Sequence, residues 1–598
     1  MILTGVLAVT PLALMNGVFL SHDVIPKVIL ILAGAAWLLF LLPQWMPALN
    51  ALWDQRDGRL FLCLVAAQWI SLLLSTVFSS QPNLSLAGTA WRRFGLIEQT
   101  ATLAIATGVA CLAAARPLWT RHLLRAIVLS GGVAALYGIL QYFGVDPFLS
   151  ANLYTFEFFG NVLRPPATLG HAIYFSAWLA PIALLAASSA GTETQTLWRR
   201  VHGSVTLMAC LAILLAGSRG AVLAVIGGGL LLLVRGWGGK LKFSPREWIA
   251  AGLLLAVMLA LPLSPAGDNL RLRLRQWRQD LGGPRVGVWR DSLALIGKHA
   301  LIGTGPETFA AEFRAIESAT LSRAYPDFYH ETPHNAFLDA AAAQGVMGAL
   351  ILAGIFVPGF RGSPPRGLQS ALLAILIASM FASLTLATSM YLWTMAGLAA
   401  ALSVDRLASG EQSSPDRTSP IGLVRIIGLV RIPAAAAGVL LVAAAIVLGV
   451  QDRAYQQLQD DVDDKNFAEA GNDYAVATGF AAGMPGYELW SSREFATLGR
   501  ALGNSAEGAS AWRKASEASA LAEKQGEERF SAAYQSAVLA VAAGDLTRAE
   551  SKARETIGLA PNWYKPHLMR GQILQAMGRN DEAAKEIGIS RDLGWRGN

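Results

Sequence analysis

The sequence carries little charge for its length. Only 15% of its 598 residues are Asp, Glu, Lys or Arg, whereas a soluble domain has about 25%. Hydrophobic residues make up 54%, and they recur in long runs with few charges. This pattern excludes a chain made only of soluble domains and is typical of a protein that crosses a membrane many times.

Cysteine is also scarce. Cys63, Cys111 and Cys210 all fall inside apolar runs and have no metal-ligand spacing, so we expect small packing residues. The net charge of +7 would suit a nucleic-acid partner, but the basic residues lie mainly in short loops between apolar runs. Basic loops in those places orient a membrane protein, and we expect no nucleic-acid partner.

The apolar runs predict about thirteen membrane spans of roughly 16 to 22 residues each. The first run, which starts at Met1, lacks a basic segment and a clear cleavage site, so we interpret it as the first span. The predicted fold is all-α, with a polytopic helix bundle over residues 1–450. The expected spans centre near residues 10, 35, 69, 105, 133, 180, 209, 228, 256, 346, 378, 396 and 441.

Basic residues predict the orientation of this bundle. They gather in six loops, and each of these loops follows an even-numbered span. The positive-inside rule places these loops and the N-terminus in the cytoplasm. The largest outward loop is then 264–333, and residues 451–598 lie outside the cytoplasm as well. The basic residues are Arg56, Arg59, Arg116, Arg121, Arg125, Arg199, Arg200, Arg235, Lys240, Lys242, Arg246, Arg361, Arg366, Arg406, Arg417, Arg425 and Arg431.

Several arginines lie in the loops that face outward. Arg219 is the clearest, because "LAILLAGSRGAVLAVIGGGLLLLV" is apolar except for "GSRG" and predicts a tight hairpin at membrane depth. A single arginine there can pair with a lipid headgroup or a carboxylate. Several on one face favour a phosphate ligand, which the guanidinium fork binds through two parallel hydrogen bonds. The others are Arg92, Arg93, Arg164, Arg285 and Arg290.

A histidine also stands at the start of an apolar run. In "FYHETPHNAFLDAAAAQGVMGALILAGIF", His334 and Asn335 directly precede the span centred near residue 346. His334 is either a loop residue that caps the next helix or a functional group at the membrane surface. An ordinary pKa of about 6.5 lets histidine act as a general base at neutral pH.

Residues 451–598 differ from the rest of the chain and are rich in Ala, Glu, Lys and Arg. Gly544 and Gly578 are 34 residues apart, as are Ala549 and Ala583. This period is typical of tetratricopeptide repeats. We expect each glycine to let two helices meet closely and each alanine to pack at the crossing. Such a helical domain binds a protein partner on its concave face or only stabilises the chain.

Three motifs resemble those of the O-antigen ligase and O-antigen polymerase superfamily. "TPHNAFLDAAAAQGVMGAL" is similar to its His-Asn-x-x-Leu…Gly-x-x-Gly signature. "GPRVGVWRDSLALIGKHALIGTGPETF" resembles the Arg-x-x-x-Trp…Gly-x-Gly segment, and "GSRGA" resembles the Ser-Arg-Gly turn. The resemblance covers about residues 60–405 and rests on the order of the motifs. The C-terminal repeats lie outside it.

The resemblance implies a glycosyltransferase that needs neither cofactor nor metal. Such enzymes transfer a glycan from a polyprenyl-diphosphate carrier to a hydroxyl of lipid A core, another glycan or a protein. They work at the outer face of the bacterial inner membrane. Because no covalent intermediate is needed, we expect inversion at the sugar. The resemblance implies functional roles for His334, Arg219 and Arg285, and substrate contacts for Arg93, Arg164, Asn335 and Arg290.

Two other functions stay open. A metal-dependent transferase that uses polyprenyl-phosphate sugars would employ acidic residues such as Asp23, whereas Asp460 to Asp464 look like a solvated helical face. A polysaccharide transporter or flippase would place charge inside the membrane, for which Glu98 is the candidate. The sugar, the acceptor class and the oligomeric state also stay open.

Overall fold

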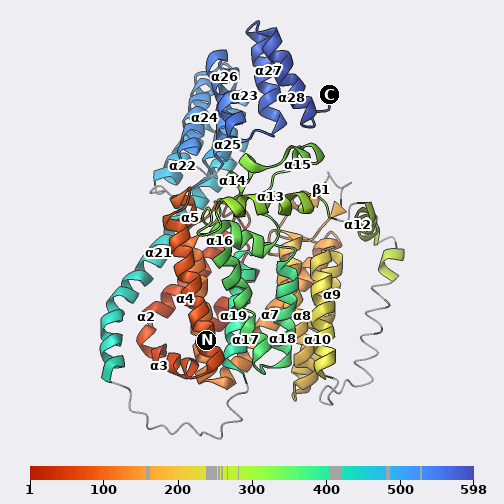
Figure 1. The fold of residues 1–598 in the computed structure, drawn as a ribbon, viewed down its shortest axis with the longest axis vertical. Coiled ribbons are helices and arrows are strands. Elements are labelled where there is room, and N and C mark those ends of the chain that lie inside the picture. The colour runs from red at the N-terminus through yellow and green to blue at the C-terminus, as the bar shows by residue number, and fades with distance from the viewer. Residues whose placement is uncertain are drawn as a thin grey trace.

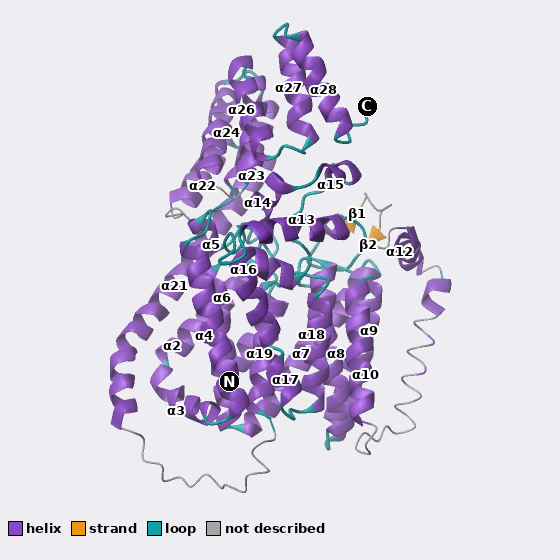
Figure 2. Cartoon of the chain, viewed as in Figure 1, coloured by secondary structure: helices purple, strands orange, loops and turns teal. Residues whose placement is uncertain are grey.

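The computed structural model describes residues 1–156, 162–236, 252, 256, 260–264, 267–279, 282–403, 421–479, 485–525 and 528–597. Helices dominate the described residues (Figure 2). Two short strands, β1 (Thr155–Phe156) and β2 (Val162–Leu163), pair antiparallel. The predicted all-α class is therefore confirmed.

Twelve of the thirteen expected span centres lie in a helix. The centre near residue 10 lies in the single turn η1 (Thr10–Leu12) that continues α1, and the centre near 256 lies in a stretch mostly outside the described residues. The helices that carry the centres, with α3, are α1 (Ile2–Val9), α2 (Ile25–Phe40), α3 (Leu42–Trp53), α4 (Arg56–Val77), α6 (Leu96–Ala115), α7 (Pro117–Tyr142), α8 (Ala172–Thr192), α9 (Thr196–Leu215), α10 (Arg219–Gly236), α16 (Ala336–Gly354), α18 (Arg366–Ser379), α19 (Leu386–Ala401) and α21 (Ile421–Asp463).

Fewer helices are long and apolar enough to cross a membrane by themselves. Among the described residues there are six, or seven if α2 and α3, bent by 88°, form one span. Three further apolar helices, Ile2–Leu12, Arg366–Ser379 and Leu386–Ala401, are shorter. A straight span needs about 20 residues. By length and composition, the described residues therefore contain fewer membrane-crossing helices than the thirteen or so spans that the sequence predicted.

The centre of the bundle is formed by α19, which is buried on nearly all sides. Trp178 of α8 and Tyr391 of α19 meet edge to face with ring centroids 5.4 Å apart. The Tyr391 hydroxyl donates to the Leu7 carbonyl of α1 at 2.8 Å, so a buried polar group is satisfied. These contacts tie the N-terminal helix to the middle of the bundle.

The predicted cytoplasmic loops gather at one end of the bundle, the lower end in Figure 1. There Arg125 near the start of α7 pairs with Glu193 after α8 at 2.7 Å. At the same end, Gly362 of the loop before α18 lies beside Asp57 at the start of α4. The residues Lys240, Lys242, Arg246, Arg406 and Arg417 lie outside the described part of the chain.

The opposite end carries the long outward loop. Between α10 and α16 this loop forms four described helices: α12 (Asp268–Gln279), α13 (Arg285–Lys298), α14 (Phe309–Ile316) and α15 (Ala319–Ala324). Figure 1 shows α13, α14 and α15 between the bundle and the C-terminal helices, which also meet α5 (Pro82–Ala87), whereas α12 lies to one side, near the upper end of α9. The turn between α9 and α10 lies at this same end.

The C-terminal helices form successive pairs. They are α22 (Phe467–Gly479), α23 (Glu488–Leu502), α24 (Ala506–Gln525), α25 (Arg529–Ala542), α26 (Leu546–Leu559), α27 (Tyr564–Ala576) and α28 (Asn580–Asp592). Neighbours α23 and α24, α25 and α26, and α27 and α28 pack together. The assignment to tetratricopeptide repeats stays a prediction.

The two repeated glycines have a different role from the expected one. Gly544 and Gly578 lie in the turns inside two helix pairs, with φ of +75° and +77°. A Cβ at either position would meet no atom within 4 Å, so no close helix contact needs them. They permit a left-handed turn, which glycine adopts at no steric cost. Ala549 and Ala583 are buried, as expected.

The C-terminal helices rest directly on loops of the bundle. The Tyr487 hydroxyl donates to the Ala90 carbonyl at 3.0 Å, and Arg93 donates to the Pro485 carbonyl at 3.1 Å. A second contact is made by Asn562, which donates to the Glu317 carbonyl at 2.7 Å. The outward loops and the C-terminal helices therefore form one packed unit.

Candidate anion-binding active site

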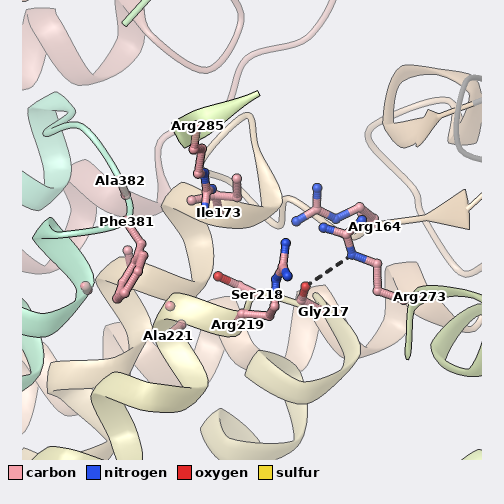
Figure 3. Close-up of a pocket in the computed structure, with 13 residues that line it drawn as sticks. Arg164, Ile173, Gly217, Ser218, Arg219, Ala221, Arg273, Arg285, Phe381 and Ala382 are labelled. Carbon is pink, nitrogen blue, oxygen red and sulfur yellow. Dashed lines mark hydrogen bonds between the residues drawn. The ribbon is translucent and has the colours of Figure 1, made fainter. Parts of the chain in front are cut away.

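Four arginines converge at the end of the bundle that carries the long outward loop. Arg164 follows β2, Arg219 begins α10, Arg273 belongs to α12 and Arg285 begins α13. They line one pocket of about 380 Å³, together with Gly217, Ser218, Ile173 and Phe381. Figure 3 shows the guanidinium groups of Arg164, Arg219 and Arg273 gathered above the turn that precedes α10. Among the described residues, those that line this pocket include no carboxylate.

The "GSRG" turn shapes the floor of this pocket. Gly217 has φ of +63°, and a Cβ there would meet Arg273 Cγ at 3.1 Å. A Cβ on Gly220 would meet Phe381 Cβ at 2.8 Å. One glycine therefore permits the turn, and the other lets α10 approach the chain between α18 and α19.

Backbone carbonyls of the same turn hold two of the arginines. Arg164 Nε donates to the Ala216 carbonyl at 3.5 Å, and Arg273 Nε donates to the Gly217 carbonyl at 3.5 Å. Their other nitrogens are directed into the pocket (Figure 3). Because α10 begins at Arg219, the positive end of the α10 helix dipole also lies beside this pocket.

The pocket carries positive charge in a poorly hydrated place. Burial, followed by the charges of Arg273, Arg285 and Arg219, lowers the pKa of Arg164 to about 9. Burial and the charge of Arg219 also lower the pKa of Arg285. An anion with several oxygens would relieve this repulsion and accept paired hydrogen bonds from the guanidinium forks.

His334 lies close enough to the cluster to feel its charge. Burial, then the charges of Arg285 and Arg92, lowers the pKa of His334 to about 4. The residue has φ of +51°, an uncommon value for histidine. The preceding Pro333 is held through its carbonyl, which accepts a hydrogen bond from Trp289 Nε1 at 2.8 Å. His334 is therefore neutral and fixed in an unusual backbone conformation.

The cap of α16 is Asn335, not His334. The Asn335 side-chain oxygen accepts hydrogen bonds from the backbone of Phe337 at 3.0 Å and Leu338 at 3.2 Å. This is the usual function of asparagine at a helix start. His334 therefore does not cap this helix, which was one of the two roles that the sequence left open for it.

A second histidine, His171, occupies the same kind of position and was missed in the sequence. Its Nδ1 accepts a hydrogen bond from the Ile173 backbone at 3.1 Å and caps α8. Burial, then Arg164 and His334, lowers its pKa to about 3. The signal was present, because "LGHAIYF" places a histidine just before an apolar run, as does "TPHNAF".

A second cavity, of about 770 Å³, lies on the other side of the first turn of α8. Ile173 lines the arginine pocket, whereas His171 and Tyr174 line this second cavity. Arg92 also lines it, and pairs with Glu307 at 3.2 Å. Aromatic, acidic and basic side chains from segments far apart in the sequence therefore surround it, namely Asp23, Lys27, Trp91, Arg92, Tyr174 and Glu331.

Three of the residues predicted to bind substrate, Arg93, Asn335 and Arg290, do not line the arginine pocket. Arg93 is fully buried beneath the C-terminal helices, where it donates to Pro485. Arg290 is half exposed; it pairs with Asp291 at 2.9 Å and also donates to Ser318. Arg273 was not predicted, although the run "RLRLRQWR" around it was visible in the long outward loop.

The structure also locates Asp23 and Glu98, the residues on which the two alternative functions depend. Asp23 lines the second cavity, and among the described residues no three His, Cys, Asp or Glu side chains are grouped so that they could hold a metal ion. Glu98 is fully buried in α6, and its carboxylate oxygens have no hydrogen-bond partner within the described chain.

Comparison with known families assigns part of this region. Residues 204–353 match the family described as O-antigen ligase. The matched segment runs from α9 to α16 and includes Arg219, Arg273, Arg285 and His334, whereas Arg164 and His171 lie before it. No curated protein matches the chain.

Proposed function

We propose that this chain, which its segment 204–353 assigns to the O-antigen ligase and polymerase superfamily, transfers a glycan from a polyprenyl-diphosphate carrier to an acceptor hydroxyl. The observation that carries the proposal is the pocket of four arginines, whose described lining residues include no carboxylate. A diphosphate is the group in such a donor that matches this charge. The acceptor is lipid A core, another glycan or a protein.

The arginine pocket would hold the diphosphate and stabilise its departure. When the bond between the anomeric carbon and the diphosphate oxygen breaks, negative charge grows on that oxygen. Arg219, Arg273 and Arg285 come from three separate elements and would donate to different oxygens of the leaving group. Fixed donors aimed at developing charge are a large source of rate enhancement.

The base in this proposal is His334, which would take the proton of the acceptor hydroxyl as the new sugar–oxygen bond forms. Burial and the charges of Arg285 and Arg92 keep the pKa of His334 low, near 4. A bound diphosphate would offset those charges and raise this pKa toward its usual range. The base would therefore become stronger when the donor is in place.

The second cavity suits the acceptor, because it adjoins the arginine pocket across the first turn of α8. A single displacement in this arrangement inverts the anomeric centre. We further propose that the site faces the outside of the bacterial inner membrane. The basic loops gathered at the opposite end support this orientation.

The test is transfer by the purified protein in liposomes that contain a polyprenyl-diphosphate glycan and an acceptor. We expect product that persists in the presence of a chelator and is lost in Arg219→Ala. The matched control is Arg513→Ala, an exposed arginine of α24 that bonds to Ser510, which should transfer as the unmodified protein does. Movement of the intact donor across the bilayer without transfer would contradict the proposal and support a flippase.

A further inference from the structure

A third cavity lies where the C-terminal helices meet the bundle. Its volume is about 570 Å³, and its walls come from the loop before α6 and from α23 and α24. This cavity is outside the segment that matches the O-antigen ligase family. The lining side chains include Trp91, Tyr487, Glu488, Trp490, Arg493 and Gln525.

One side chain, Trp91, lines both this third cavity and the second cavity. The indole is 47% exposed and meets Tyr487 edge to face, with ring centroids 4.6 Å apart. The next residue, Arg92, lines the second cavity and pairs with Glu307. A chain-like ligand could therefore occupy both cavities by passing over a single tryptophan.

The wall around Tyr487 is held rigidly. The Tyr487 hydroxyl lies within hydrogen-bond distance of two acceptors, Asp452 Oδ1 at 2.6 Å and the Ala90 carbonyl at 3.0 Å. The rings of Tyr455 and Trp490 pack against Tyr487 with centroids at 4.9 and 6.3 Å. A wall fixed in this way loses little freedom when a ligand binds, which favours affinity.

The side chains in this cavity suit a sugar. A pyranose has a face of C–H groups, which packs on the rings of tryptophan and tyrosine, and an edge of hydroxyls that need hydrogen-bond partners. Trp91 and Trp490 supply aromatic surface, and the exposed Arg493 supplies donors at the edge. Glu488 is buried and already accepts from the Gly486 backbone at 3.0 Å, so it helps to fix the wall. A peptide would find no continuous apolar groove among these charged groups.

We infer that the third cavity binds a sugar unit of the acceptor glycan that lies several bonds away from the reacting hydroxyl. The inference rests on the proposed function, since that function puts the reacting end of the acceptor in the second cavity. Binding at both cavities at once raises the effective concentration of the reacting end. Longer acceptors should therefore bind more tightly than short ones.

The experiment measures glycan binding without donor, so that it does not depend on transfer. Envelope glycan is released by mild acid, freed of lipid, separated by length and titrated into the full-length protein in nanodiscs. Trp490→Ala and Arg493→Ala are compared with Arg500→Ala. Arg493 and Arg500 are both exposed on α23, and Arg500 lies outside the cavity and bonds to Thr497.

We expect long fragments to bind more tightly than short ones. Both cavity variants should weaken the binding of long fragments on the order of tenfold, because aromatic and arginine anchors carry most of the energy of such contacts. Arg500→Ala should bind as the unmodified protein does. In transfer assays Arg493→Ala should raise KM for long acceptors and leave kcat unchanged.

Two results would overturn the inference. One is unchanged binding of long fragments by Arg493→Ala and Trp490→Ala. The other is saturable binding of serine-rich synthetic peptides, but not of glycans, that depends on Arg493. If the unmodified protein binds glycan at this cavity yet transfers nothing, the third cavity is still a glycan site, and it is the proposed function that fails.

Discussion

Arg273 of α12 donates from Nε to the carbonyl oxygen of Gly217, in the turn before α10, at 3.5 Å. This bond joins the loop 264–333 to the turn before α10 and directs the remaining Arg273 nitrogens into the arginine pocket (Figure 3). It unites two segments that are 56 residues apart.

The first prediction concerns Arg273 itself. Arg273→Ala should weaken donor binding roughly tenfold to a hundredfold, since a hydrogen bond to a charged group contributes about 1.5 to 3 kcal/mol. The Arg273→Lys variant should bind the donor more weakly than the unmodified protein but more tightly than Arg273→Ala. Lysine keeps the charge but loses the two parallel hydrogen bonds of the guanidinium group. Equilibrium binding of a polyprenyl diphosphate measures this. Arg275→Ala, an exposed arginine of the same helix, is the control; equal losses in both would assign the effect to α12 as a whole.

The second prediction concerns the pH dependence of kcat/KM, which reports the free enzyme. Burial, together with Arg285 and Arg92, lowers the pKa of His334 to about 4. The base therefore stays neutral, and kcat/KM should not decline until the pH falls well below 6. Arg285→Gln removes a cation and should move the acid limb upward, toward about 6.5. An acid limb near 6.5 in the unmodified protein would contradict this.

The same shifts affect stability. Burial, with nearby cations, also lowers the pKa of His171 to about 3, whereas an unfolded histidine titrates near 6.5. The unfolded chain therefore binds more protons between these values, and the free energy of unfolding should fall as the pH drops from about 6.5 toward 4. Thermal unfolding in detergent at several pH values measures this. His171→Gln should flatten the dependence; an unaltered slope would place the titration elsewhere.

The third prediction separates chemistry from binding at His334. His334→Ala should reduce transfer by about 10² to 10⁴, the usual contribution of a general base. Binding of the lipid-linked donor should persist, because the arginines hold the diphosphate. Quenched-flow transfer at saturating donor, beside donor binding, distinguishes the two effects.

Loss of donor binding with full turnover in His334→Ala would make His334 a positioning residue. Of the other nearby candidates for a base, Asp327 bonds to Tyr564 at 2.9 Å, and His330 lies 3.8 Å from buried Glu317. Glu331 lines the second cavity and accepts from Tyr174 at 3.5 Å. Glu331 would then be the next residue to test.

The fourth prediction concerns the C-terminal helices. If these helices only recruited the acceptor, their removal would only raise KM for the acceptor. Because Pro485 covers the buried Arg93 and Tyr487 holds Ala90, deletion of residues 451–598 should also lower thermal stability and turnover. Arg93→Ala should lower thermal stability but keep donor binding. Arg219→Ala should weaken donor binding but keep thermal stability. A truncated protein with unchanged turnover would contradict this.

The sequence predicted the helices well because hydrophobic runs of span length are a local signal. It drew attention to Arg164 and Arg219 because charge is unusual beside such runs, and to Arg285 through the family resemblance; the structure brings these three arginines to one pocket. It could not predict Arg273 in the same way, since a basic stretch in a polar loop looks like a solvated surface until tertiary contacts bring it to Gly217. Arg93 is the opposite case. Its unusual charge suggested a substrate contact, but the structure places it against the Pro485 carbonyl, to which it donates a hydrogen bond.

The glycine repeat shows what a sequence period can and cannot predict. The 34-residue spacing of Gly544 and Gly578 indicated paired helices, and the structure pairs them. It gave no information on backbone dihedrals, so a left-handed turn was mistaken for a close helix contact. The contacts of the C-terminal helices with Ala90 and Glu317 connect residues hundreds of positions apart, and no local pattern encodes them.

The central claim is that the four arginines bind the diphosphate of a lipid-linked donor. An electron cryomicroscopy structure with a bound polyprenyl diphosphate tests it most directly. The account predicts both phosphates within hydrogen-bond distance of Arg164, Arg219, Arg273 or Arg285, with the sugar end toward His334. Phosphates bound instead in the second cavity, against Lys27 and Arg92, would contradict it.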